Sequence, residues 1–238
     1  EVISVDKTGK LKVHTTKTAS AVITASYGPV VQNVTVTVAD GRFWYSLGNG
    51  LGNGLDNNWY LDGNNASVVS SDGNKTTVQM GSGYRGDLWL ARSGKGKIVN
   101  VTPADYRYFA IKVGFKSQLV PGKNKPNGCI KLEIFDDGIK KIGPEYFGTG
   151  GDANNRYEIL GASEISTTEP NVLYYDLQSK YKTVTPTDWN QVFDLVQCKF
   201  VIADFPETAQ TYDLYWIRSF KSIEELQAFV DSENNTNE

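Results

Sequence analysis

Short apolar runs alternate with polar residues and turn signals along almost the whole chain. The runs are rich in β-branched and aromatic residues and are bounded by Gly, Pro, Asn or Asp, as is typical of antiparallel strands. Helical periodicity is almost absent between them, and no strand-helix-strand alternation occurs. The pattern predicts an all-β fold, an antiparallel β-sandwich or jelly roll. Nine runs after residue 42 carry it: FWYSL, SVVSS, TTVQM, DLWLARS, YRYFAIKVGF, CIKLEIF, VLYYDL, CKFVIADF and YDLYWIRSF.

The alternation also assigns residues to the two faces of each strand, because successive side chains point to opposite sides. In DLWLARS, Leu88 belongs to one face and Trp89 to the other, so Trp89 lies either on an exposed sheet face or in a second core layer. Trp216 lies in a strand that is apolar on both faces, which indicates a structural role. Tyr108 and Lys112 are expected on the outer face of their strand. The inward positions of that strand are Phe109, Ile111, Val113 and Phe115.

One helix is predicted near the C-terminus, in SIEELQAFVDSE. Ser222 and Glu225 have the spacing of a capping box, in which each side chain satisfies a backbone amide at the start of a helix. The helix has one apolar face, so we expect it to dock on the sandwich as a C-terminal clasp. The residues of this face are Ile223, Leu226, Phe229 and Val230.

The N-terminal segment has a different character. AVITASYG and QNVTVTVAD alternate apolar and polar residues, which predicts two half-buried antiparallel strands. With its V-D-x-x-G-x-L turn, A-x-I-T-A strand and V-T-V-T-V strand, the segment resembles the back half of a bacterial immunoglobulin-like domain of the second group. That resemblance implies a partial spacer over residues 1–40, followed by a β-sandwich over residues 41–238. Because Glu1 stands in mid-pattern, without an initiator methionine or signal peptide, we expect the C-terminal part of a longer protein.

Composition and charge narrow the classes of partner. Hydrophobic residues make up 39% and aromatic residues 12% of the 238 positions, which is ample for a packed core. The net charge is -3 and no lysine- and arginine-rich run occurs, so we expect no nucleic-acid partner. A strongly anionic polysaccharide is also disfavoured, although a local basic pocket remains open. No apolar run approaches the roughly 20 residues that cross a bilayer.

Metal and thiol chemistry has little support. Cys129 and Cys198 are expected to be buried free thiols rather than a disulfide, because two cysteines make no disulfide framework. His14 is the single histidine, and no Cys-His cluster suggests zinc. We expect no cofactor, with one alternative, a structural calcium held by carboxylates of the loops. The acids in question are Asp56, Asp62 and Asp72.

The sequence does not predict catalysis. Glycoside hydrolysis needs two carboxyl groups about 5 to 9 Å apart, and no spacing here singles out a pair. No serine nucleophile motif occurs, and the only histidine lies in the spacer-like segment, which excludes a His-dependent triad. We therefore expect a non-enzyme without catalytic residues. The acids considered, which fit solvated turns and strand edges better, are Glu133, Asp136, Asp137, Glu145 and Glu158.

A carbohydrate-binding module requires aromatic rings that stack on sugar faces, and polar groups that bond to hydroxyls. Trp59, Tyr84 and Trp189 stand in polar, turn-rich segments, where each ring either meets a ligand or folds back to close the end of the sandwich. Arg85 and Asp87 bind sugar hydroxyls or form a structural ion pair. The candidate binding residues are Trp44, Trp59, Tyr60, Tyr84, Arg85, Trp89 and Trp189.

A glycine- and asparagine-rich loop, SLGNGLGNGLDNNWYLDGNN, spans residues 46–65. It lacks the strand-to-helix setting and the G-K-[ST] of a phosphate-binding loop. Trp-Tyr pairs close to both of its ends argue against a flexible linker. We expect tight turns that present Trp59 either to a glycan or to the core.

Four motifs of the C-terminal part are similar to modules of a known class. NVTPADYRYFAIKVGF, YYDL, CKFVIADF and TYDLYWIRSFKSIEELQAFV resemble the C-terminal modules of surface glycan-binding proteins from Bacteroides-type polysaccharide utilisation loci. The resemblance covers roughly residues 42–233. Tyr108 replaces the proline of the usual YP turn, and the shared motifs are strand and helix positions, so they identify no binding residue.

That resemblance implies a β-sandwich of carbohydrate-binding-module type on an outer-membrane lipoprotein at the cell surface. It would capture oligosaccharides for a TonB-dependent transporter, and its only link to the membrane would be an N-terminal lipid anchor outside this chain. We therefore expect non-catalytic binding of a neutral oligo- or polysaccharide. Two alternatives stay open, a structural or adhesive β domain that contacts protein and an accessory domain of a glycoside hydrolase.

Overall fold

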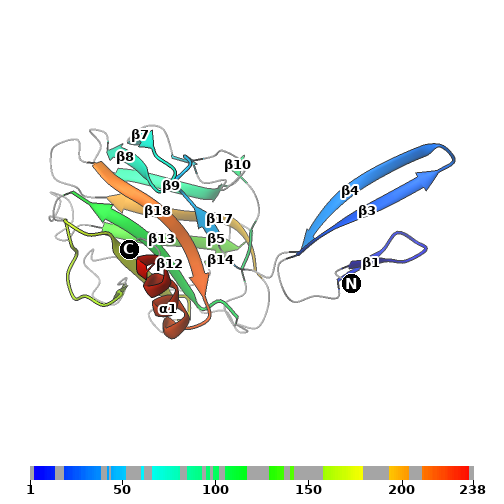
Figure 1. Ribbon diagram of the computed structural model, residues 1–238. Coiled ribbons are helices and arrows are strands. Elements are labelled where there is room, and N and C mark those ends of the chain that lie inside the picture. Colours follow the sequence, from blue (N-terminus) through cyan, green and yellow to red (C-terminus); the bar gives the residue numbers. More distant parts are fainter. Residues whose placement is uncertain are drawn as a thin grey trace.

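The computed structural model shows two antiparallel sheets packed as a sandwich, with two-stranded sheets near the N-terminus outside it (Figure 1). The expected all-β sandwich is confirmed. The structure describes residues 3–13, 19–38, 42, 44–51, 60–61, 66–80, 85–92, 95–96, 99–101, 105–116, 129–136, 140–141, 158–178, 193–203 and 211–235.

The front sheet is the one that carries β18 and faces the reader in Figure 1. All of its paired strands are antiparallel. Its order is β15 (Glu158–Ile159), β16 (Asn171–Asp176), β12 (Tyr108–Phe115), β18 (Thr211–Phe220), β8 (Thr76–Met80) and β7 (Ala66–Ser71), with β5 (Trp44–Ser46) also paired to β18.

The back sheet lies behind it and is also antiparallel. Each of the nine apolar runs that were expected to be strands contains a strand of one of these two sheets. The order of the back sheet is β10 (Lys95–Gly96), β9 (Arg85–Arg92), β17 (Phe193–Ala203), β13 (Cys129–Asp136) and β14 (Lys140–Lys141), with β6 (Tyr60–Leu61) paired to β9 and β11 (Val99–Val101) paired to β17.

The core lies between the two sheets. From the back sheet, Leu88 and Phe200 are 2% and 1% exposed. The ring of Phe200 meets that of Tyr175 edge-on at 6.4 Å, which joins the two layers. The predicted inward positions of β12 are confirmed. The residues at these positions, each at most 2% exposed, are Phe109, Ile111, Val113 and Phe115.

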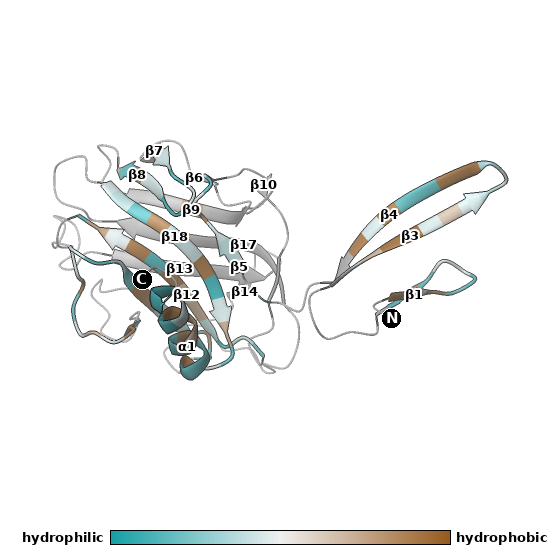
Figure 2. Ribbon diagram, viewed as in Figure 1, coloured by the Kyte–Doolittle hydropathy of each residue, from teal (hydrophilic) through white to brown (hydrophobic). Residues whose placement is uncertain are grey.

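Helix α1 (Ile223–Asn235) covers part of the outer face of the front sheet, as the predicted clasp should (Figure 1). The amide of Glu225 donates to Ser222 Oγ at 3.2 Å, which confirms the predicted cap. Leu226 is fully buried, and Figure 2 shows hydrophobic residues on the helix where it meets the sheet. No helix in the described part of the chain has both the length and the apolar character needed to cross a membrane.

Aromatic rings form the contact between helix and sheet. Phe220 is completely buried and lies 5.6 Å from the ring of Phe229 and 6.2 Å from that of Trp216. Trp216, 3% exposed, donates its indole N–H to Glu233 at 3.0 Å, and Lys112 donates to the same oxygen at 3.1 Å. The predicted structural role of Trp216 is thereby confirmed.

The register of the back sheet separates the two cysteines. Cys129 pairs with Ala203, whereas Cys198 pairs with Ile134. The two positions are therefore five residues apart along β17, a span of roughly 16 Å. Cysteines whose Cα atoms are more than about 7 Å apart cannot be bridged. The register excludes a disulfide between them.

Two hairpins occupy the N-terminal segment: β1 (Ile3–Val5) with β2 (Leu11–Val13), and β3 (Ala19–Tyr27) with β4 (Val30–Val38). The predicted turns occur, and Gly28 has a φ of 56° at the tip of the second hairpin. The predicted half-burial of β3 and β4 is confirmed only in part. Ala21, Ile23 and Val36 share a face and are partly buried, whereas Val22 and Val34 are 62% and 54% exposed. In the described sheets these two strands pair only with each other.

Candidate functional site

The first residues of the glycine-rich loop are fixed on the front sheet. Leu47 is fully buried, and its amide donates to the carbonyl of Tyr215 at 2.9 Å. The Thr76 hydroxyl donates to the carbonyl of Leu47. The amide of Gly73 donates to the carbonyl of Gly48 at 3.1 Å. The start of the loop is therefore held by β18 and by the β7–β8 turn, as a rigid loop requires.

The other described end of the loop belongs to the back sheet. Tyr60 lies beside Trp89 in the pairing of β6 with β9, and Leu61 lies beside Leu88. Leu88 belongs to the core and Leu61 packs against it. Residues that are directly opposite in an antiparallel pair share a face, and successive residues alternate. Tyr60 and Trp89 therefore occupy neighbouring positions on the outer face of the back sheet.

The same row continues across the next two strands. Lys199 of β17 is opposite Trp89, and Glu133 of β13 is opposite Lys199. We call Tyr60, Trp89, Lys199 and Glu133 the back-face row. Arg85 and Asp87 share its face, because they lie four and two residues before Trp89 on β9. In strand register, the row runs from two aromatic residues to a lysine and then a glutamate.

The structure brings together three of the seven candidate residues, namely Tyr60, Arg85 and Trp89. Trp44 lies instead on β5 of the front sheet, where it is 42% exposed. Its ring is 5.3 Å from that of Phe229, and the guanidinium of Arg42 lies 3.9 Å from its centroid. Trp44 thus takes part in the contact with α1. The remaining candidates, Trp59, Tyr84 and Trp189, lie outside the described residues.

Sequence reasoning did not identify Lys199 as a site residue and considered Glu133 only as a catalytic acid. No local signal marks either residue, because their place beside Trp89 follows from strand register alone. Of the acids considered, Glu133 and Asp136 lie in β13 of the back sheet, whereas Glu158 lies in β15 of the front sheet. Asp137 and Glu145 lie outside the described residues.

The calcium alternative has one described residue. Asp72 accepts hydrogen bonds from the amides of Asn74 and Lys75 at 2.9 Å each. These bonds stabilise the β7–β8 turn and lower the pKa of the Asp72 carboxyl. Asp56 and Asp62 lie outside the described residues. Among the residues that the structure places, no three His, Cys, Asp or Glu side chains gather as metal ligands would.

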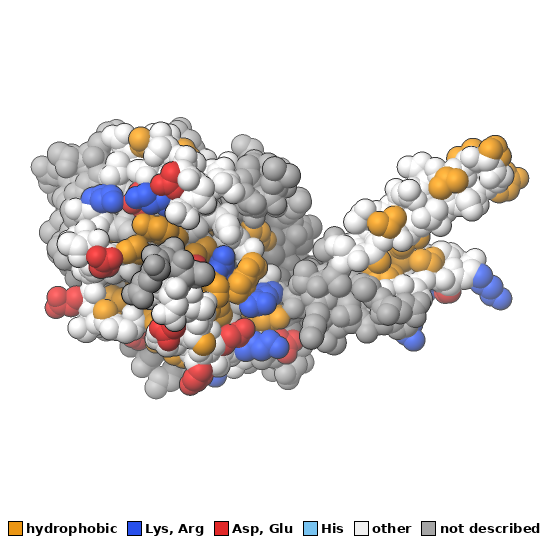
Figure 3. Space-filling view, in the orientation of Figure 1, with side chains coloured by type: hydrophobic (Ala, Val, Ile, Leu, Met, Phe, Trp, Pro, Cys, Tyr) orange, Lys and Arg blue, Asp and Glu red, His pale blue; other side chains and the backbone are white. Residues whose placement is uncertain are grey.

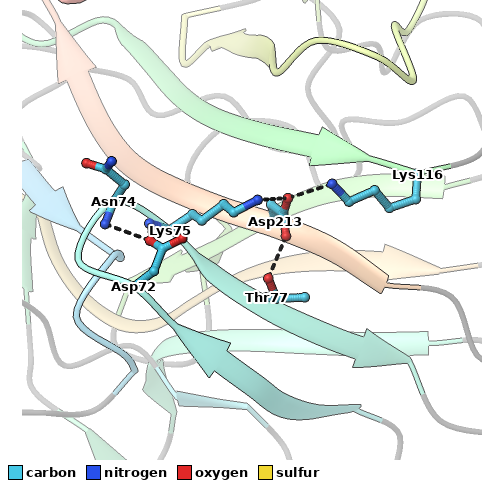
Figure 4. A network of polar contacts seen from close by, with 6 residues as sticks. All are labelled: Asp72, Asn74, Lys75, Thr77, Lys116 and Asp213. Atoms are coloured by element: carbon cyan, nitrogen blue, oxygen red, sulfur yellow. Dashed lines mark hydrogen bonds and ion pairs between the residues drawn. The ribbon is translucent and has the colours of Figure 1, made fainter. Parts of the chain in front are cut away.

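A second polar constellation lies on the outer face of the front sheet (Figure 4). The buried carboxylate of Asp213 accepts Lys75 at 2.7 Å and Lys116 at 2.9 Å on one oxygen, and Thr77 at 2.7 Å on the other. Burial raises the pKa of Asp213, but these hydrogen bonds lower it by more, so the pKa lies below the ordinary value of 3.8. The same bond raises the pKa of Lys75.

Acid should therefore weaken the fold through Asp213. A folded-state pKa below the unfolded value of 3.8 gives stability that is present above pH 3.8 and is lost as the pH falls through the folded-state pKa. At pH 7, Asp213→Asn is expected to lower the free energy of unfolding by about 1–3 kcal/mol. Urea titrations between pH 7 and pH 2.5 should show this difference shrinking below pH 3.8; a pH-independent difference would contradict it.

Comparisons with known proteins place the chain in one family. A family model described as a domain of unknown function (DUF4979) matches residues 50–226, which include strands of both sheets of the sandwich and the start of α1. A search of curated proteins and a search of solved structures each gave no match. Because the match covers well over half of the sequence, the chain belongs to the DUF4979 family, a domain of unknown function.

Proposed function

We propose that this protein is a non-catalytic module that binds a neutral oligo- or polysaccharide. The observation that carries the proposal is the back-face row, in which Tyr60 and Trp89 are neighbours on one sheet face and Lys199 and Glu133 follow them. Aromatic rings stack on the apolar face of a pyranose, while charged side chains bond to its hydroxyls.

The spacing of the row suits a chain of sugars. Neighbouring strands are about 4.8 Å apart, close to the length of one sugar unit in an extended glycan. A glycan that crosses the strands could therefore place one unit over each position, first on the aromatic pair and then beside Lys199 and Glu133. Arg85 and Asp87 would flank such a chain and help fix its orientation.

The biological setting of the proposal rests on the motif resemblance. Like the modules that its C-terminal motifs resemble, the protein would act at the bacterial cell surface, on an outer-membrane-anchored chain. It would hand captured glycans to a TonB-dependent transporter of the same uptake system.

Trp89→Ala is expected to weaken glycan binding about tenfold or more, because it removes one of the two stacking rings. Affinity gel electrophoresis through a panel of neutral polysaccharides would first identify one that retards the wild-type protein, and the variant would then be run through the same gel. Trp44→Ala is the matched control, since Trp44 lies on the other sheet and should leave retardation unchanged.

Other results would point to the alternatives. If no gel retards the wild-type protein, glycan binding fails and an adhesive domain that contacts protein becomes the better explanation. Sugars released from a retained polysaccharide, and lost on Glu133→Gln, would indicate glycoside hydrolysis instead. Equal weakening by Trp44→Ala and Trp89→Ala would place the site elsewhere than on the back-face row.

A further inference from the structure

Tyr215 is the extra residue of a β-bulge in β18. Lys112 of β12 pairs with Trp216 and the next residue, Val113, pairs with Leu214, so Tyr215 has no partner on β12. Its carbonyl accepts the amide of Leu47 instead. A bulge shifts the alternation by one position, so both Tyr215 and Trp216 belong to the outer face. Trp216 is buried beneath α1, whereas Tyr215 is only half-buried.

The ring of Tyr215 lies next to the glycine of the neighbouring strand. A Cβ on Gly114 would be 3.6 Å from Tyr215 Cε2, in ordinary van der Waals contact. The ammonium of Lys112 is 5.5 Å from the ring centroid, so a cation also stands beside the ring. Among the described residues no group bonds to the Tyr215 hydroxyl.

Two further ammonium groups, those of Lys75 and Lys116, interact electrostatically with Tyr215 on the same outer face. In Figure 4, Lys75 and Lys116 approach Asp213 from opposite sides, one from the β7–β8 turn and one from the end of β12. The carboxylate is almost fully buried, whereas the two lysine side chains are 31% and 54% exposed. Within the described part of the chain, each ammonium bonds to Asp213 alone, so two of its three N–H donors remain.

The geometry points to a binding site for an acidic sugar, in which Lys75 and Lys116 hold the carboxylate and Tyr215 stacks on the pyranose ring. The exposed groups of this site are mostly donors, because the Asp213 carboxylate between the lysines is buried. The exposed carboxylate of Asp72, beside Lys75, already accepts two backbone amides. A ligand carboxylate is an acceptor-only group and complements such a set better than a hydroxyl does. The site lies on the opposite sheet from the back-face row, so it does not depend on the proposed function.

The site matches the local basic pocket that the overall charge left open. Asp213 acts as a positioning residue that holds two flexible lysine side chains near one place. Figure 3 shows basic and acidic side chains beside hydrophobic ones on this face of the sandwich, the combination that a charged sugar with one apolar face requires. Lys112 forms an ion pair with Glu233, so it would interact with the ring of Tyr215 rather than with the carboxylate of the ligand.

The test uses the whole chain and three probes: trigalacturonic acid, the same trimer with its carboxyls methyl-esterified, and acetate. In ¹H–¹⁵N titrations the free acid should shift the amides of Tyr215 and Lys116, whereas the ester should bind at least about tenfold more weakly because it lacks the charge. Lys116→Met should weaken acid binding about tenfold and leave neutral-glycan retardation unchanged. Lys12→Met removes one positive charge from β2 instead, and it should change neither the binding of the acid nor the neutral-glycan retardation.

The ring has its own variants. Tyr215→Leu should weaken binding of the trimer several-fold but leave binding of acetate unaffected. Tyr215→Phe should keep the stacking on the sugar ring. Trp89→Ala should leave acid binding intact, which separates this site from the back face. The inference is overturned if the trimer causes no shifts, if the ester binds as well as the acid, or if acetate matches the trimer and Tyr215→Leu has no effect, which would indicate an anion site only.

Discussion

Phe220→Ala is expected to lower the free energy of unfolding by about 3–5 kcal/mol, the range for large-to-small changes of buried aromatic residues. Phe220 is completely buried at the end of β18, and its ring contacts those of Trp44, Trp216 and Phe229. The variant leaves a cavity between the front sheet and α1 that the surrounding rings cannot fill. Urea titration followed by tryptophan fluorescence would measure the loss.

Two control variants sharpen this prediction. Phe220→Leu retains most of the volume and should cost less than about 1.5 kcal/mol. Tyr27→Ala removes a ring that is 90% exposed at the tip of the second hairpin and should change the stability by less than about 0.5 kcal/mol. In addition, the amides of α1 should exchange faster in Phe220→Ala. A loss below about 1 kcal/mol would show that the clasp contributes little to the fold.

Gly48→Ala is expected to destabilise the protein by about 3 kcal/mol or more, because the new methyl group has nowhere to go. A Cβ at this position would lie 2.2 Å from the carbonyl oxygen of Gly73 and 2.6 Å from the carbonyl carbon of Asn74. Both are backbone atoms and cannot rotate away as a side chain would. To make room for the methyl group, the hydrogen bond from the Gly73 amide to the Gly48 carbonyl must break. The start of the glycine-rich loop must then move away from the β7–β8 turn.

Gly114→Ala provides the matched control. Its Cβ would meet no heavy atom closer than 3.5 Å, so its stability should stay within about 1 kcal/mol of wild type. Thermal unfolding of both variants would make the comparison. If Gly48→Ala is as stable as Gly114→Ala, the loop base is not held as the structure shows. A stable Gly48→Ala that loses neutral-glycan retardation would instead indicate that the loop orients the back face.

Much of the fold could be predicted from the alternation of residues. Each apolar residue at an inward position of β12 is buried as expected, because burial on one face leaves a period-two record in a strand. The helix was predictable from its cap and apolar face for the same reason. The short strands β6, β10, β11, β14 and β15 were not expected, since two or three residues are too few to show a period.

The candidate site was harder to predict, because register is a non-local property. Tyr60 and Trp89 are both evident as aromatic residues, but their adjacency depends on a pairing between β6 and β9. The bulge at Tyr215 leaves no sequence signal either, since one extra residue only makes two neighbouring aromatics share a face. Trp44 was a candidate binding residue, yet the rings beside it, Phe220 and Phe229, come from the far end of the chain.

The separateness of β3 and β4 has a thermodynamic consequence. A two-stranded hairpin that joins no larger sheet is at best marginally stable, so the opening of β3 and β4 is expected to be a local event outside the cooperative unit of the sandwich. All five tryptophans come after residue 43. Intrinsic tryptophan fluorescence therefore reports on the part of the chain that follows the two hairpins, and not on the hairpins themselves. The hairpin is visible only to amide exchange or to a probe at Tyr27, and its melting would not contribute to any free energy obtained from tryptophan emission.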